Sequence, residues 1–169
     1  MRVTLKLVEA DTENVLINLM EKSEYEFSQY HRWDVNKNGL YGCYFEEEYR
    51  DENGKYAAFL IDVDGKLAGF VMIGDGEIKG DKKTDYQVNE LFVMHKYRRL
   101  GVGKQVLSKI LDAYKGTWKV TYHPGNEASA FFWERIANEH TNGKYELIKS
   151  DPHEDYSYAD GTLGDVLYF

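Results

Sequence analysis

The stretch that decides the fold runs from Glu90 to Lys104 and reads ELFVMHKYRRLGVGK. Its first residues are β-prone. After Gly101 the apolar residues recur every fourth position, at Val102, Val106 and Ile110, which is typical of an amphipathic helix. The stretch therefore predicts a strand, a glycine-bearing turn and a helix. The first amides of a helix lack partners inside the helix and carry the positive end of its dipole, so such a turn is a potential anion site.

Positive charge gathers at this turn although the chain as a whole is acidic. Arg98, Arg99 and Lys104 lie in or beside it, whereas the 169 residues carry a net charge of −8. This local inversion of sign favours a small phosphorylated ligand. The phosphate-binding pattern G-x-x-x-x-G-K-S/T is not met, because Gly103-Lys104 is followed by Gln105, and the pattern G-x-G-x-x-G lacks its third glycine. A tight turn without a ligand is the alternative.

Two motifs together resemble a known family. Residues 98–103 fit the pattern R/Q-x-x-G-x-G/A. Residues 126–134 resemble N-x-x-A-x-x-F/L-Y-E, with Ser129 in place of the first alanine and Trp133 in place of the tyrosine. The motifs follow each other in the right order with one strand expected between them. On these residues the chain resembles the GNAT family of N-acetyltransferases, firmly over residues 86–136 and loosely over the whole order of elements.

The hydrophobic pattern predicts a single mixed α/β domain over residues 1–169. Helices are expected after residues 11, 101 and 126, and Asp64-Gly65 predicts a hairpin turn. Alternation predicts strands near residues 3–8, 56–62, 67–73, 86–93, 118–122, 145–149 and 166–169. The resemblance implies a mixed, mostly antiparallel central sheet, with a parallel β-α-β acyl-CoA-binding core and helices on both faces.

The resemblance implies acetyl-CoA as the co-substrate. Carried over to this chain, the residues that would line its pyrophosphate are Arg98, Arg99, Gly101, Val102, Gly103 and Lys104. The backbone of Phe92 and Val93 would bind the pantetheine arm, and a bulge in this strand would part it from the strand at residues 118–122. Asn126 would contact the cofactor from the other side, and Trp133 would form a packing wall against the thiol arm or the core.

The resemblance also implies direct transfer of an acetyl group to a primary amine of a small molecule or peptide. The amine must be neutral to attack, so a general base is useful. Glu90 is the candidate base, because the family often keeps a carboxylate at this strand position; a surface glutamate in a salt bridge is the alternative. An indole cannot act as an acid, so Trp133 leaves the general acid open, with Tyr97 and Tyr122 as candidates.

The acceptor wall is expected in the aromatic region between Tyr25 and Tyr44. Exposed rings there could cradle a cation or a planar substrate, or they could instead belong to the core. The rings in question are Tyr25, Phe27, Tyr30, His31, Trp33, Tyr41 and Tyr44.

Composition narrows the class of protein. Hydrophobic residues make up 43% and charged residues 30%, as in a soluble globular domain, and the longest apolar run is far short of the ~20 residues of a membrane span. The acidic surplus argues against nucleic acid as a partner. Cys43 is the single cysteine, which favours a cytoplasmic protein and a small buried residue over a nucleophile. The five histidines show no metal-ligand spacing, so no metal is expected.

Two rival functions remain at this stage. One is a family member that binds acyl-CoA without transferring the acyl group. The other is a protein-interaction module whose glycines only form a turn. The last strands could form an edge within the chain or the seam of a homodimer.

Overall fold

The computed structural model describes residues 1–169 except 51–53, 77, 80–81, 153–156 and 160. Seven strands form one sheet in the order β1-β2-β3-β6-β7-β9-β8. They are β1 (Val3–Leu7), β2 (Ala57–Val63), β3 (Lys66–Asp75), β6 (Tyr86–Val93), β7 (Trp118–Tyr122), β8 (Glu146–Ile148) and β9 (Asp165–Tyr168). Within this sheet β6 and β7 are parallel, and the other neighbours pair antiparallel.

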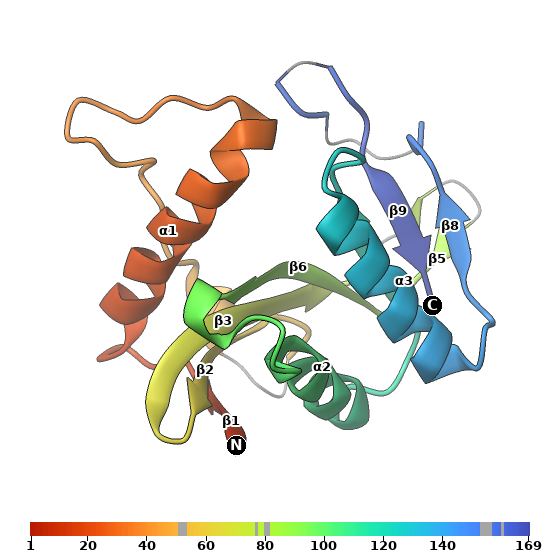
Figure 1. Cartoon of the computed structure of the whole chain (residues 1–169), viewed down its shortest axis with the longest axis horizontal. Coiled ribbons are helices and arrows are strands. Elements are labelled where there is room, and N and C mark those ends of the chain that lie inside the picture. The colour runs from red at the N-terminus through yellow and green to blue at the C-terminus, as the bar shows by residue number, and fades with distance from the viewer. Residues whose placement is uncertain (51–53, 77, 80–81, 153–156, 160) are drawn as a thin grey trace.

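Helices cover both faces of the sheet (Figure 1). Helix α1 (Glu13–His31) lies on one face, and α2 (Val102–Ala113) and α3 (Glu127–Thr141) lie on the other. Two single turns, η1 (Glu47–Arg50) and η2 (His95–Tyr97), precede β2 and α2. A two-stranded ribbon, β4 (Ile78–Lys79) with β5 (Lys82–Lys83), forms a second, small sheet.

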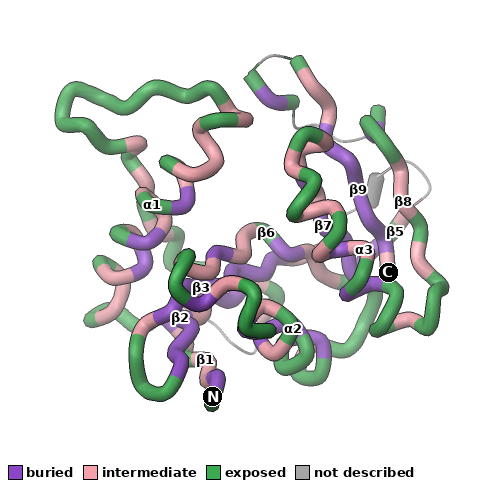
Figure 2. The backbone as a smooth tube through the Cα atoms, viewed as in Figure 1, coloured by how far each residue is buried: buried purple, intermediate pink, exposed green. Residues whose placement is uncertain are grey.

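The two faces have separate cores, and the helices contribute to them unequally. On the α2 face, Val102, Val106 and Ile110 are almost fully buried, as their spacing predicts. On the α1 face the fully buried residues of the helix are Leu16, Leu19 and Ser23, all in its first eleven residues. Figure 2 shows the buried segments gathered along the central strands. The second half of α1 therefore has no buried anchor of its own.

The structure confirms the mixed α/β fold, with a mostly antiparallel sheet, a parallel β-α-β core and helices on both faces. The strand expected at residues 86–93 coincides with β6, and the helices expected after residues 101 and 126 begin at Val102 and Glu127. In the predicted hairpin turn, Asp64 (φ 51°) and Gly65 (φ 77°) both adopt the left-handed conformation that a type I′ turn requires.

Candidate active site

A gap between β6 and β7 begins at a bulge in β6. Ile73 of β3 pairs with Val88 and Met72 pairs with Glu90, so Asn89 is an extra residue in β6. β6 pairs with β7 only through its first three residues. A bulge bends its strand and interrupts the ladder, and beyond it this edge of β6 has no strand partner among the described residues. The expected bulge and the parting of the two strands are thus confirmed.

Backbone groups at the open edge of β6 can be assigned from the bonds on its closed edge. The amide of Met94 donates to β3 at 2.8 Å, and a Cβ added to Gly69 of β3 would come within 2.0 Å of the Phe92 carbonyl oxygen. Backbone groups alternate between the two edges along a strand, so those of Leu91 and Val93 face the gap. The backbone of Phe92 is turned toward β3, and the open edge offers Leu91 in its place.

The glycine turn presents unbonded amides at the start of α2. Gly101 has φ 77°, and the first helical bond runs from the Gln105 amide to the Gly101 carbonyl oxygen at 3.1 Å. The amides of residues 102–104 precede that bond and are the orphan donors of the helix. A Cβ on Gly103 would meet the Phe132 ring at 3.1 Å, so glycine also allows α3 to approach α2 closely. The turn keeps the geometry of an anion site.

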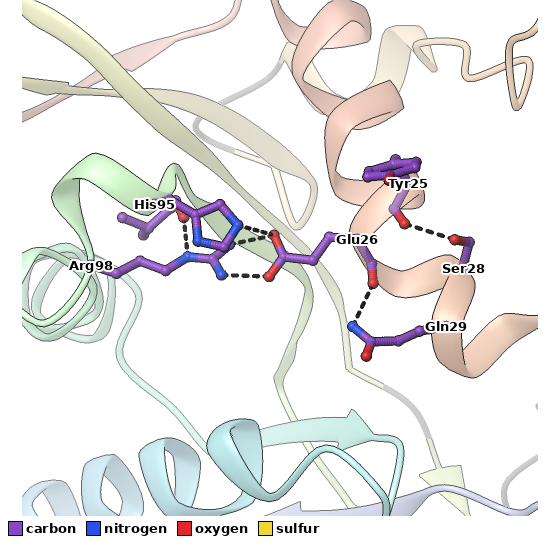
Figure 3. A network of polar contacts seen from close by, with 7 residues as sticks. Tyr25, Glu26, Ser28, Gln29, His95 and Arg98 are labelled. Atoms are coloured by element: carbon purple, nitrogen blue, oxygen red, sulfur yellow. Dashed lines mark hydrogen bonds and ion pairs between the residues drawn. The ribbon is translucent and has the colours of Figure 1, made fainter.

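The three cations near the turn are placed differently. The Lys104 ammonium lies 2.7 Å from a Glu139 carboxylate oxygen on α3. The Arg98 guanidinium turns toward α1 and binds Glu26, as Figure 3 shows. Arg99 is exposed and has no ion pair among the residues that the structure describes. Of the predicted phosphate-binding cations, Arg99 is therefore the one whose charge is uncommitted.

A cavity of about 360 Å³ occupies the gap and reaches from α1 across β6 and β7 to α3. Its lining includes Glu24, Phe27 and His31 from α1, residues 87–91 of β6 and residues 119–122 of β7. It also includes His123 directly after β7, Asn126, Ser129 and Trp133 at the start and in the middle of α3, and Tyr158. The expected base Glu90, Asn126 and Trp133 thus meet at one cavity, although Glu90 comes from β6 and the other two from the start and the middle of α3.

The Glu90 side chain lies on the wall that α1 covers. Burial raises the pKa of this carboxyl to about 7, while the nearby Ser23 hydroxyl lowers it and the negative charge of Glu24 raises it. Glu90 Oε1 and Ser23 Oγ are both shielded from solvent, and neither makes a hydrogen bond of good geometry with the described residues. A carboxyl group that titrates near neutral pH is suited to accept a proton from an incoming amine.

A second carboxylate faces the same cavity from α1. Glu24 Oε2 lies 3.7 Å from His31 Nδ1, and only 20% of the Glu24 side chain is exposed. Glu24 lies one helical turn from Phe27, which lines the same wall. Two carboxylates on one wall make the cavity favourable for a cationic ligand such as an ammonium group.

Aromatic rings join three distant segments at one end of the cavity. His123 stacks on Tyr30 of α1 with ring centroids 5.0 Å apart, and it meets Tyr158 edge-on at 4.4 Å. Tyr158 in turn lies 5.2 Å from the ring of His31. Of the rings expected to form the acceptor wall, Phe27 and His31 line this cavity, whereas Tyr25 and Tyr44 are exposed.

The loop after α1 is tied to the helix by one carboxylate. Glu21 accepts the backbone amides of Tyr41 and Gly42 at 2.8 Å and that of Cys43 at 2.9 Å. Partial burial raises the pKa of Glu21, but these bonds outweigh it and the net pKa is lowered. Burial and the neighbouring Glu21 raise the pKa of the Cys43 thiol to about 12, which disfavours the thiolate that a nucleophile needs.

Of the residues considered for the general acid, Trp133 and Tyr122 line the cavity and Tyr97 does not. Trp133 is buried and lines the cavity. Tyr97 is buried in the core on the α2 face. Tyr122 lines the cavity, and burial together with the charges of Glu134 and Asp165 raises the pKa of its buried hydroxyl to about 12. Glu134 lies on α3, and Asp165 lies on β9, which borders β7 on the side away from β6 and Glu90.

Asn126 has a structural task as well. Its side chain accepts the Ser129 amide at 3.1 Å and so caps the start of α3.

Among the described residues no group of three His, Cys, Asp or Glu side chains is placed to hold a metal ion. In the same part of the chain no helix is long and apolar enough to cross a membrane.

A family model described as the acetyltransferase (GNAT) family matches residues 16–137, which is more than half of the chain. The chain belongs to the GNAT family. The resemblance of its two motifs is thereby confirmed. No curated protein matches the sequence.

Solved GNAT structures share the fold at low sequence identity. Arabidopsis thaliana Naa50, in complex with the bisubstrate analogue CoA-Ac-MVNAL, is 16% identical, with a TM-score of 0.61 over 100% of this chain and 99% of that one. The ribosomal-protein-S18-alanine N-acetyltransferase of Escherichia coli is 16% identical, with a TM-score of 0.54 over 99% and 91%. The histone acetyltransferase HPA2 and related acetyltransferase from Corynebacterium glutamicum is 11% identical, with a TM-score of 0.68 over 99% and 96%.

Several residues of this GNAT cavity carry no signal in the sequence. Glu24 reads as an ordinary polar position on a helix, as do Ser23 and Glu26, which lie near it in α1 without lining the cavity. His123 lies shortly before the second motif but outside it, and Tyr158 lies far from both motifs. The one usable hint is the helical spacing of Glu24, Phe27 and His31, which places them along one face of α1. That spacing shows which side chains share a face and not which face meets β6.

Proposed function

We propose that the protein transfers an acetyl group from acetyl-CoA to a primary amine by direct attack, with Glu90 as the general base. The observation that carries this proposal is the position of the Glu90 carboxyl. It stands beside the extra residue of β6, at the gap, with a pKa raised to about 7 by burial. A base poised near the working pH combines a useful ionised fraction with a useful driving force.

The open edge of β6 and the turn before α2 are suited to hold the co-substrate. The orphan amides of residues 102–104 would bind the pyrophosphate at the positive end of α2, with the exposed Arg99 adding charge. The backbone groups of Leu91 and the amide of Val93 would bind the pantetheine arm as a neighbouring strand would, with Leu91 in place of Phe92. The Val93 carbonyl oxygen already accepts a hydrogen bond from Arg98 Nε. When bound, acetyl-CoA supplies an activated acyl group and a thiolate leaving group.

Each group that lines the cavity would then take part in one step of the proposed reaction. The ammonium form of the acceptor would be attracted by Glu24 and Glu90, and Glu90 would take one proton to give the neutral amine. The nitrogen lone pair would form the new C–N bond to the acyl carbon while the C–S bond breaks and its electron pair leaves with sulfur. The remaining extra proton on nitrogen would then pass to the departing thiolate, so that the products are the neutral amide and the CoA thiol. An amide on the open edge, that of Leu91 or Val93, would donate to the carbonyl oxygen as negative charge develops there.

Trp133 supports one competing function. It stands where the family motif has a tyrosine, and an indole has a donor but no transferable proton at neutral pH. A protein that binds acyl-CoA without transferring the group would fit this substitution. The rival predicts binding of CoA species without turnover of any amine.

The first test is a thermal-shift titration with acetyl-CoA, free CoA and ATP in parallel. A ligand at 100 times its dissociation constant stabilises the native state by about 2.7 kcal/mol. Stabilisation by both CoA species and not by ATP would support the proposal. No shift with either CoA species at millimolar concentration would overturn it.

The second test measures release of free CoA with a panel of amines. Spermidine, tyramine, lysine and a short peptide with a free N-terminus cover cationic, aromatic, amino-acid and peptide acceptors. Turnover that depends on the amine, and that disappears in Glu90→Gln, separates an acetyltransferase from the binding-only rival. Equal turnover in the wild type and Glu90→Gln would remove Glu90 from the reaction.

A further inference from the structure

The side chain of Arg98, the first residue of the glycine motif, is bound to helix α1. Its two terminal nitrogens meet the two carboxylate oxygens of Glu26 on α1, one of them at 2.6 Å, in a bidentate pair (Figure 3). Its Nε donates to the Val93 carbonyl oxygen at 2.6 Å, and the guanidinium carbon lies 5.7 Å from the centre of the Phe92 ring. The Nε and both terminal nitrogens of Arg98 therefore point away from the start of α2.

The pair therefore lies on the opposite side of the sheet from the orphan amides of the turn. Phe92 packs in the cluster that holds α1, whereas Val102 packs in the cluster that holds α2 and α3. Because the guanidinium lies over the ring of Phe92, its positive charge is on the face of the sheet that α1 covers. The Arg98 guanidinium is thus committed to Glu26, whereas the neighbouring Arg99 is exposed and has no ion pair among the described residues.

Glu26 lies in the part of α1 that needs an anchor. The buried residues of the helix end at Ser23, and the cavity-lining Glu24, Phe27 and His31 all follow it. Across this half of the helix, the bidentate pair joins α1 to the turn after β6, a separation of 72 residues in sequence. The rings of Tyr30 and His123 form a second attachment nearer the end of the helix.

We propose that Glu26 is a positioning residue: through Arg98 it ties the second half of α1 to the glycine turn and so holds the acceptor wall in place. Phosphate recognition then falls to Arg99 and the backbone amides. The inference rests on the proposed function in one respect, namely that the cavity takes the acceptor. It assigns the two adjacent arginines to different substrates.

The pair is expected to matter more than an ordinary surface ion pair. Exposed pairs contribute little, because water screens them and both side chains lose freedom. Here the side chains are 32% and 28% exposed, the contact is bidentate, and the ring of Phe92 covers one side. Bidentate charge-assisted bonds are among the stronger polar contacts in proteins. The nearby His95 adds little, since its ring is 83% exposed and 3.8 Å away.

The test compares Glu26→Gln, Arg98→Gln and the double variant with Arg99→Gln, a change of the same kind at the neighbouring residue. Three quantities are measured: the dissociation constant of CoA by calorimetry, hydrogen exchange of residues 24–31, and KM for the amine that the wild type acetylates fastest. Glu26→Gln and Arg98→Gln should each speed exchange in residues 24–31 and raise the amine KM about tenfold, equivalent to about 1.4 kcal/mol. Their CoA dissociation constants should stay within about twofold of the wild type, the change expected of residues that do not touch the ligand.

The double variant should resemble either single variant, because each alone already breaks the tie. Arg99→Gln should show the reverse pattern, with weaker CoA binding and unchanged exchange in residues 24–31. The proposal is overturned if Arg98→Gln weakens CoA binding as much as Arg99→Gln does, or if exchange in residues 24–31 is unchanged. If the wild type fails to bind CoA, the proposed function fails, and the exchange comparison still decides whether the tie exists.

Discussion

The two sides of the gap between β6 and β7 present different chemical groups, backbone on one side and side chains on the other. The side toward α2 consists mainly of backbone: the orphan amides of residues 102–104 and the edge groups of Leu91 and Val93. The side toward α1 consists of side chains, with Glu24 and Glu90 as its carboxylates. Backbone groups bind any ligand with the right phosphate and amide geometry, whereas side chains select by charge and shape. The difference teaches that the side proposed to bind the co-substrate, here called the cofactor side, is predicted from a short motif. The side proposed to bind the amine, here called the acceptor side, is recognised only in the fold.

The largest expected effect tests the acceptor side at Glu90. Glu90→Gln keeps the shape but cannot accept the proton, so kcat should fall by about 10²- to 10⁴-fold, the usual worth of a general base. CoA affinity should stay the same, because the side chain faces α1. In the wild type, kcat/KM should rise with pH through about 7, and this limb should be missing from the variant's profile. Steady-state kinetics from pH 5 to 9 check both points.

The same substitution should stabilise the fold at high pH. The folded pKa of Glu90 is raised from 4.5 to about 7, so the native state binds the proton more tightly than the unfolded state. The resulting stability is complete below 4.5 and is lost as the pH rises through 7. Glu90→Gln should therefore melt like the wild type near pH 4.5 and above it at pH 8. A lower melting temperature at pH 8 would contradict the burial of this charge.

The matching test of the cofactor side is Gly103→Val. The new side chain would press against Phe132, because even a Cβ lies 3.1 Å from that ring. Overpacking of this kind costs about 1–3 kcal/mol of stability, and the shift of α3 against α2 should weaken CoA binding about tenfold. Gly101→Ala is the matched control, since its Cβ meets open space and only the φ of 77° is strained. Calorimetric binding of CoA and a thermal melt on each variant separate packing from backbone strain.

What could be predicted from the sequence differs between the same two sides of the gap. Residues 98–103 and 126–134 lie within continuous segments, so their spacing predicted the strand, the turn and both helices correctly. The role of Glu90 as a base stays a prediction. Ser23, Glu24 and Glu26 came to the site through the packing of α1 on β6, which depends on contacts of Leu16 and Leu19 with strands some 40 to 75 residues away in sequence. Which edge of β6 the backbone groups of Phe92 face depends on the bulge at Asn89 and on how β6 pairs with β3 and β7. Local patterns contain neither fact.

A smaller effect is expected at Glu21, which holds the loop against the acceptor side. Glu21→Gln leaves one oxygen where two accepted three amides, so exchange in residues 41–43 should speed up and the amine KM should rise a few-fold. The folded pKa of Glu21 is lowered, so in the wild type this contribution is complete above the ordinary 4.5 and is lost as the pH falls through the lowered value. Hydrogen exchange of the loop at pH 7 and in acid checks the direction. CoA affinity serves as the control, because no contact of Glu21 reaches the turn.

The smallest effect is expected at Lys104, and it bears directly on what the turn is made of. Its ammonium already lies 2.7 Å from Glu139, a carboxylate whose pKa is held down by its bonds to Lys104 and Arg135. With 52% of the lysine side chain exposed, water and salt screen its field further. Lys104→Met should therefore change the CoA dissociation constant by only about twofold, the effect of a weakly coupled surface charge. A tenfold loss would mean that the lysine leaves Glu139 when phosphate arrives, and the cofactor side would then depend on side chains as much as the acceptor side does.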